Sequence, residues 1–109
     1  MKARVLVVDD HPAFRKALTS ALRLVGDIEV AGEAGGGIAA CEGAEQLKPD
    51  IVLMDLSMPD LSGIDAMKKI HETQPDLPVV ILTAHADEEA AVRVRPHEDD
   101  GWNDHQRPR

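Results

Sequence analysis

The chain has 109 residues, of which 43% are hydrophobic and 29% are charged, and its formal net charge at pH 7 is -8. This length fits one domain with its own core, and the composition is that of a globular protein rather than a disordered one. The negative charge argues against non-specific binding to nucleic acid or anionic membranes, because both depend on clustered Lys and Arg. It fits metal cations or basic partners better.

The single cysteine and the N-terminal segment set two further limits. One cysteine, Cys41, can form neither an internal disulfide nor a cysteine-based zinc site, which is typical of a reducing cytosol. Only four apolar residues, 5–8, follow the basic start, too few for a signal sequence or a membrane span. We therefore expect a soluble, cytoplasmic protein.

Strands and helices are predicted to alternate along the chain. Short apolar runs predict strands at 5–8, 51–54 and 79–82, and a less apolar run predicts an edge strand at 28–34. Apolar residues at helical spacing predict helices from Pro12 to about Gly26, at 38–48, and from Ser62 or Gly63 to about Glu72. Residues 87–92 are expected to begin a fourth helix. This alternation predicts an α/β domain with a doubly wound parallel sheet.

Three carboxylates follow two of these predicted buried strands. Asp9 and Asp10 come directly after residues 5–8, and Asp55 comes directly after residues 51–54. Because ligands bind at the carboxyl edge of open α/β sheets, we expect the three acids to gather there. Their repulsion requires a cation or retained protons, and oxygen-only ligation favours Mg²⁺ or Mn²⁺ over zinc or copper.

Two readings of these residues remain open at this point. Besides the cation site, each acid taken alone has an ordinary structural reading: Asp10 could cap the first helix, Asp9 could be solvated, and Asp55 could be a turn carboxylate. Three of the five histidines, His11, His71 and His85, do not show the spacing of metal ligands, whereas His97 and His105 lie among acidic residues and could bind a metal adventitiously.

Three motifs resemble the receiver domain of bacterial two-component response regulators. They are Val7-Val8-Asp9-Asp10-His11-Pro12, Asp55-Leu56-Ser57-Met58-Pro59 with Gly63 eight residues after the aspartate, and Leu82-Thr83-Ala84. The resemblance covers residues 2–94, and it is strongest to the subgroup usually fused to a LuxR-type helix-turn-helix. It implies a flavodoxin-like doubly wound sheet and a signalling module rather than an enzyme.

The resemblance also implies a role for each site residue. Asp55 would accept a phosphoryl group from a sensor histidine kinase. Asp10, Asp55 and the backbone carbonyl of Ser57 would ligate Mg²⁺ or Mn²⁺, and Asp9 would act mainly through metal-bound water. The hydroxyl of Thr83 and the backbone amide of Ala84 would bind phosphoryl oxygens.

The chain departs from the family after residue 94. Receiver domains have a fifth strand ending in a lysine, then a fifth helix, and neither is recognisable here; the lysines are Lys2, Lys16, Lys48, Lys68 and Lys69. We therefore expect an incomplete receiver domain at 1–94 and an irregular, non-family tail at 95–109. The ending is that of a truncation, a frame change or an engineered end. Without a fifth strand, residues 79–82 are expected to be an unpaired edge unless the tail covers it, which predicts self-association or marginal stability.

The leading hypothesis is a truncated or atypical phosphoacceptor without an output domain, which binds neither nucleic acid nor membrane directly. The alternative is a degenerate receiver that acts as a protein-interaction module without productive phosphorylation, because the family lysine is missing. A hydrolase of the haloacid dehalogenase kind is disfavoured, since its second acid belongs where this chain has Ser57. A flavodoxin is disfavoured because Asp9 and Asp10 would repel its phosphate.

Overall fold

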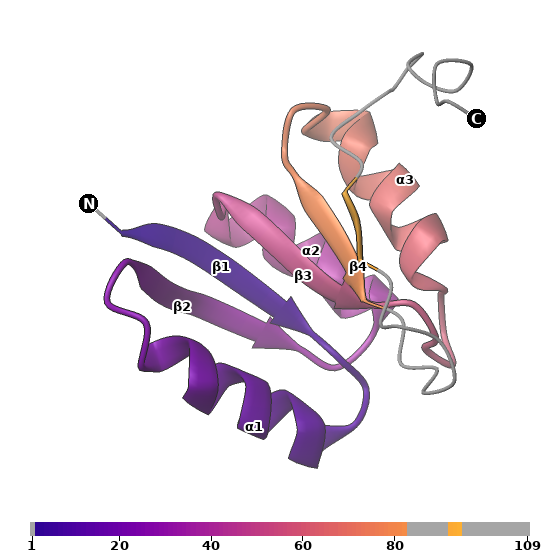
Figure 1. Cartoon of the computed structure of the whole chain (residues 1–109). Helices are drawn as coiled ribbons and strands as arrows, with labels where there is room; N and C mark the ends of the chain where they lie inside the picture. Colours follow the sequence, from indigo (N-terminus) through magenta and orange to yellow (C-terminus); the bar gives the residue numbers. More distant parts are fainter. Residues whose placement is uncertain (1, 83–91, 95–109) are drawn as a thin grey trace, which may run out of the picture.

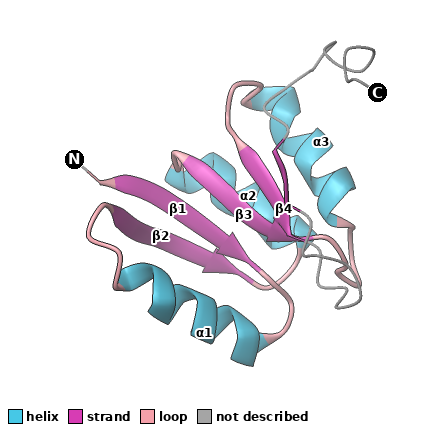
Figure 2. Ribbon diagram, in the orientation of Figure 1, coloured by secondary structure: helices cyan, strands magenta, loops and turns pink. Residues whose placement is uncertain are grey.

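A computed structural model describes residues 2–82 and 92–94. This part of the chain forms a five-stranded sheet in the order β2-β1-β3-β4-β5, with α1 on one face and α2 and α3 on the other (Figures 1 and 2). The strands are β1 Ala3–Val8, β2 Ile28–Ala34, β3 Ile51–Asp55, β4 Val79–Leu82 and β5 Val92–Val94, and the helices are α1 Pro12–Arg23, α2 Gly37–Leu47 and α3 Gly63–Thr73. Strands β1 to β4 are parallel, so the predicted α/β, flavodoxin-like class is confirmed.

The helix ends follow from local chemistry. Pro12 lies in the first turn of α1, where its missing N–H leaves no hydrogen bond unmade. Ser62 caps α3, because its hydroxyl accepts a hydrogen bond from the backbone N–H of Asp65 at 3.1 Å. Helix α2 ends at Leu47, and its C-cap residue Lys48 has a left-handed φ of 49°. Pro49 follows and cannot continue the helix. None of the helices in the described ranges is long and apolar enough to cross a membrane.

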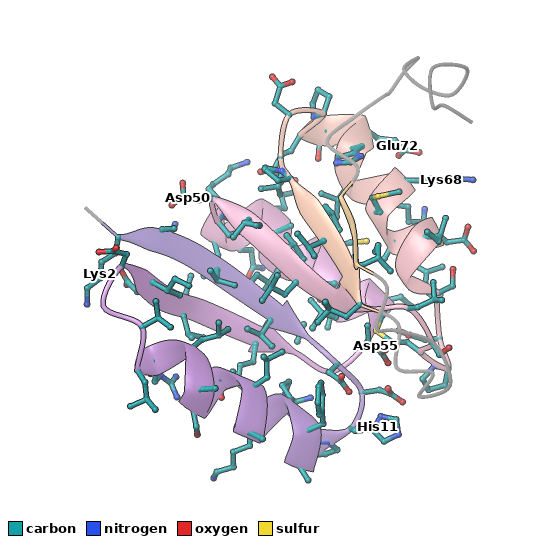
Figure 3. All side chains as sticks on the ribbon, viewed as in Figure 1. Lys2, His11, Asp50, Asp55, Lys68 and Glu72 are labelled. Carbon is teal, nitrogen blue, oxygen red and sulfur yellow. The ribbon has the colours of Figure 1, made fainter. Side chains whose placement is uncertain are left out.

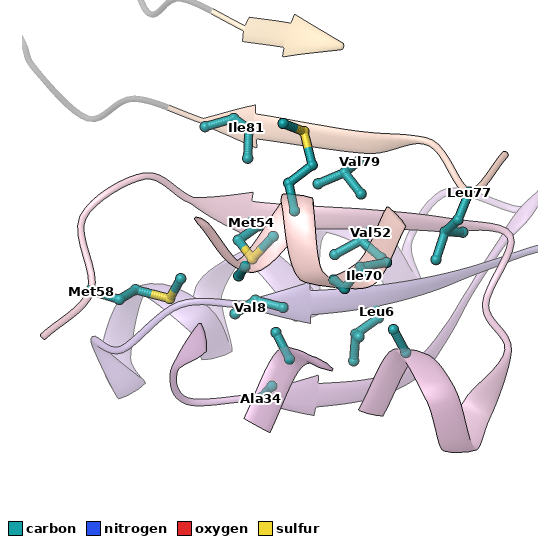
Figure 4. Close-up of a cluster of buried hydrophobic side chains, with 14 residues drawn as sticks. Leu6, Val8, Ala34, Val52, Met54, Met58, Ile70, Leu77, Val79 and Ile81 are labelled. Atoms are coloured by element: carbon teal, nitrogen blue, oxygen red, sulfur yellow. The ribbon is translucent and has the colours of Figure 1, made fainter. Parts of the chain in front are cut away.

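The main core fills the space between the sheet and the helices α2 and α3 (Figure 4). Leu6, Met54 and Ile81 point into it from three strands and are at most 1% exposed. Small, fully buried side chains line the two helices and allow their close approach: Ala40, Ala44 and Ala66. This packing holds β1 and β3 rigidly side by side, so their carboxyl ends keep a fixed relation to each other.

Strand β5 corrects two of the expectations. Val92 was expected to be helical, whereas it opens β5; residues 87–91 lie outside the described ranges. The expectation that the outer edge of residues 79–82 is unpaired is also wrong. Strand β5 pairs with that edge of β4 in antiparallel fashion, with Val92 opposite Leu82. The apolar edge of β4 offers backbone groups for pairing, and the three residues of β5, two of which are β-branched valines, pair with it although the segment is too short to show periodicity. The predicted tail at 95–109 lies outside the described residues.

Candidate functional site

The three predicted acids meet where the two central strands end. Val8 pairs with Met54, so the residues that follow on β1 and β3 emerge together at one edge of the sheet. The carboxylate oxygens of Asp9, Asp10 and Asp55 and a ring nitrogen of His11 all lie within 4.8 Å of one another. We call these four residues the acid cluster. Figure 3 shows Asp55 and His11 at this edge, with Lys2 and Asp50 at the opposite end.

His11 is the member of the acid cluster that the sequence did not identify. Its Nδ1 lies 3.4 Å from Asp9 Oδ1 and 3.3 Å from Asp10 Oδ1, and its backbone N–H donates to Asp9 Oδ1 at 2.8 Å. The ring reaches the acids through the turn at the end of β1, so no regular spacing could reveal it. His71 does not belong to the acid cluster: its Nε2 lies 2.8 Å from the carbonyl oxygen of Leu77.

Arg15 supports the site from the first turns of α1. Its Nη1 donates to the backbone carbonyl of Asp9 at 2.7 Å, and its Nε lies 3.0 Å from Glu33 Oε1 on β2. The guanidinium therefore joins the end of β1 to a neighbouring strand. Sequence reasoning missed this contact, since it depends on how α1 lies across the sheet and not on a motif.

Burial and mutual repulsion shape the electrostatics of the acid cluster. Asp9 is 5% exposed and Asp55 is 9% exposed. Burial raises the pKa of Asp55, and the nearby charges of Asp9 and Asp10 raise it further, while the backbone N–H groups of Leu56 and Ser57 lower it in part. Ionising Asp55 therefore costs more free energy than ionising a free aspartate, and positive charge nearby would lower that cost.

One oxygen of the cluster is left without a hydrogen bond. Asp10 Oδ1 is buried and accepts none from the described residues; His11 Nδ1 lies near it but not in hydrogen-bonding alignment. An unsatisfied buried carboxylate oxygen is costly, and a cation would remove the cost. Three carboxylates are also the oxygen donors that Mg²⁺ and Mn²⁺ prefer. The residues present therefore fit such an ion.

The loop after β3, residues 56–62, returns the chain to α3 beside the site. The backbone N–H of Gly63 donates to the carbonyl of Leu56 at 2.8 Å, and Met58 is buried in the core at 8% exposure. A Cβ on Gly63 would lie 2.5 Å from the carbonyl oxygen of Asp55, so only glycine fits without movement. Ser57 lies exposed in this loop. The two remaining predicted site residues, Thr83 and Ala84, fall outside the described ranges.

Comparisons with known proteins agree with this architecture. The chain is 43% identical over 89 residues to the uncharacterized transcriptional regulatory protein YhcZ of Bacillus subtilis, covering 82% of this chain and 42% of that protein. It is 40% identical over 94 residues to the response regulator protein VraR of Staphylococcus saprophyticus, covering 86% and 45%. The chain thus spans less than half the length of these curated relatives.

Solved structures and a family model agree as well. The signal receiver domain of the putative response regulator NarL from Mycobacterium tuberculosis is 37% identical, with a TM-score of 0.72 over 80% of this chain and 70% of that one. The response regulator domain of Thermotoga maritima CheB is 40% identical, with a TM-score of 0.75 over 84% and 67%. The family model of the response regulator receiver domain matches residues 5–101. The chain belongs to the response regulator receiver domain family, the signalling domain of two-component systems.

Proposed function

We propose that this receiver domain accepts a phosphoryl group on Asp55 from the phosphohistidine of a sensor histidine kinase, with Mg²⁺ bound at the acid cluster. The observation that carries the proposal is the meeting of three carboxylates, one with a buried unsatisfied oxygen, at the ends of β1 and β3. A carboxylate oxygen of Asp55 forms the new O–P bond while the P–N bond to the kinase breaks and the imidazole leaves.

Each residue of the site has a distinct part in this proposal. Asp10, Asp55 and the backbone carbonyl of Ser57 hold the cation, and Asp9 acts on it indirectly. When bound, Mg²⁺ supplies charge neutralisation for the transferring phosphoryl oxygens. The backbone N–H of His11 keeps Asp9 oriented, and Arg15 fixes the Asp9 carbonyl from α1.

The proposal extends to the two residues directly after β4. The hydroxyl of Thr83 and the backbone amide of Ala84 are proposed to bind phosphoryl oxygens. Both follow Leu82, whose register partner is Asp55, and this pairing supports the assignment. Their roles otherwise rest on the sequence motif.

A second candidate function is favoured by the distribution of basic residues. The sequence contains no lysine after Lys69, so the cation with which the family binds the phosphoryl group is missing. Arg15 does not replace it in the described part of the chain, because its guanidinium is engaged by Asp9 and Glu33. A receiver that docks on a kinase without productive phosphorylation is therefore the alternative.

Intact-mass measurement after incubation with acetyl phosphate and Mg²⁺ tests the proposal. We expect one phosphoryl adduct on the wild type, its loss in Asp55→Asn and on chelation of Mg²⁺, and its retention in Asp50→Asn. Asp50 is the matched control because it also carries one carboxylate at a strand end, but at the opposite edge of the sheet (Figure 3).

Three results would count against phosphoacceptance by Asp55. No adduct on the wild type, together with retained binding to a histidine kinase, would support the interaction module. An adduct that persists in Asp55→Asn would place the chemistry elsewhere. Continuous hydrolysis of acetyl phosphate that persists in Asp55→Asn would point to a phosphatase that does not use Asp55.

A further inference from the structure

A carboxylate from the loop after β3 caps helix α2. Asp60 Oδ1 accepts the backbone N–H of Gly37 at 3.0 Å, and Oδ2 accepts that of Ile38 at 3.1 Å. Helix caps usually come from the residue at the helix boundary itself, but Gly36 holds that position and has no side chain. Helix α2 therefore receives its cap from 23 residues further along the chain.

The charge of Asp60 suits this position. Backbone N–H groups, first that of Gly37 and then that of Ile38, lower the pKa of Asp60, so it is a carboxylate at neutral pH. The N-terminus of a helix carries partial positive charge, which attracts such a group. The contact is thus both a pair of hydrogen bonds and an interaction with the helix dipole.

Two glycines make room for the loop at this helix end. A Cβ on Gly36 would lie 3.0 Å from both carboxylate oxygens of Asp60. A Cβ on Gly37 would lie 2.6 Å from Leu61 Cβ and 2.7 Å from the Leu61 carbonyl oxygen, and a backbone atom cannot swing aside. Gly36 and Gly37 therefore provide the space that residues 60 and 61 occupy.

The seated loop is the one that carries the proposed cation ligands. Ser57 lies between Asp55 and Asp60, so the direction of its carbonyl depends on the path of the loop. Two other contacts hold the loop: Met58 is buried in the core, and the backbone N–H of Gly63 donates a hydrogen bond to the carbonyl of Leu56. Asp60 adds the link to α2.

We infer that Asp60 is a positioning residue for the acid cluster: it fixes the 56–62 loop on α2 and so orients Asp55 and the Ser57 carbonyl. The inference rests on the proposed function, in which these two groups hold the cation. Asp60 acts through the loop and touches none of the reacting atoms. It also makes the α2 N-terminus part of the support of the site, although none of the proposed ligands belongs to α2.

The first test is calorimetric titration with Mg²⁺ of wild type, Asp60→Ala, Asp60→Asn and Asp50→Ala. Asp50→Ala is the matched control, because Asp50 Oδ2 also accepts a backbone N–H, that of Arg4 at 2.8 Å, and lies far from the cluster. Mutation of a residue hydrogen-bonded directly to a metal ligand typically weakens metal binding about 10- to 100-fold, and a residue that acts through the loop is expected to fall at the lower end of that range, at about 10-fold. We expect that loss in Asp60→Ala, a much smaller change in Asp50→Ala, and partial rescue in Asp60→Asn, because asparagine keeps one accepting oxygen but loses the second acceptor and the negative charge.

Hydrogen exchange without Mg²⁺ is the second test, and it separates this inference from the proposed function. Asp60→Ala is expected to speed exchange at the amides of Gly37, Ile38 and Gly63, whereas Asp50→Ala is expected to leave them unchanged. Unchanged exchange at Gly63, or a Mg²⁺ affinity no weaker than that of Asp50→Ala, overturns the inference. If the wild type binds no Mg²⁺, the proposed function fails, and exchange at Gly63 alone then decides whether Asp60 holds the loop.

Discussion

Gly63→Ala is the change for which the structure makes the sharpest prediction. The added Cβ would lie 2.5 Å from the carbonyl oxygen of Asp55, 3.1 Å from Leu56 Cα and 3.3 Å from the carbonyl carbon of Asp55. All three are backbone atoms next to the acid cluster. The clash therefore cannot be relieved by rotating a side chain, and either α3 or the end of β3 has to move.

The size of the effect follows from these distances. A carbon–oxygen contact is ordinarily about 3.3 Å or longer, so the Asp55 carbonyl and the new methyl must separate by roughly 0.8 Å. Overpacking of this kind costs about 1–3 kcal/mol, and the lower entropy of alanine in the unfolded chain returns about 0.4–1 kcal/mol. We expect a net loss of about 1–2 kcal/mol, or a fall in Tm of about 4 °C or more.

Urea and thermal unfolding followed by circular dichroism measure this loss. Gly26→Ala is the matched control, because a Cβ there meets nothing within 4 Å and Gly26 does not have a positive φ. That variant is expected to be as stable as the wild type or slightly more stable. If Gly63→Ala unfolds at the same midpoint as Gly26→Ala, the described approach of α3 to the end of β3 is wrong.

Three further predictions concern other parts of the molecule. Burial and the charges of Asp9 and Asp10 raise the pKa of Asp55 in the folded protein above the value of about 3.9 that it has in the unfolded chain. The folded state is therefore favoured most while Asp55 is protonated, and this part of the stability is lost as the pH rises through the raised pKa. Asp55→Asn is thus expected to resist urea better than wild type at pH 7 without divalent cations, by a margin that shrinks towards pH 4; equal midpoints at pH 7 would contradict this. Lys48→Gly relieves the left-handed φ of 49° and is expected to stabilise by roughly 0.5–1 kcal/mol in urea unfolding, a gain that Lys48→Ala should not reproduce. Arg93→Pro interrupts β5 opposite Ile81 and is expected to increase self-association through the 79–82 edge in analytical ultracentrifugation, and an unchanged sedimentation profile would argue against β5 as its cover.

The sequence predicted those parts of the fold that depend on periodicity and on strand ends. Apolar runs such as 51–54 are recognisable because a strand covered on both faces needs them, and Asp55 is recognisable because it ends one. The parallel order then brings Asp9 and Asp10 to the same edge. No side chain beyond these positions was needed for that inference.

The remaining contacts depend on geometry that carries no repeating signal. His11 and Arg15 reach the site through a turn and through the way α1 lies on the sheet, and Asp60 finds α2 across 23 residues. Strand β5 has only three residues, and a run of that length fits a helix as well as a strand. These features result from tertiary packing, which a local pattern does not encode.

The pairing of β1 with β3 has a consequence for how the chain folds. Val5 lies opposite Ile51, so the middle of the sheet closes only when distant segments meet, and such non-local pairing slows folding. The same closure forces Asp9 and Asp10 towards Asp55, so their repulsion opposes it. A divalent cation that binds the native acids, but not the separated strands, is therefore expected to favour closure. Refolding rates and unfolding midpoints at low and high Mg²⁺ would measure this effect of the cation on formation of the sheet. Identical rates and midpoints would show that repulsion among the acids does not oppose the pairing of β1 with β3.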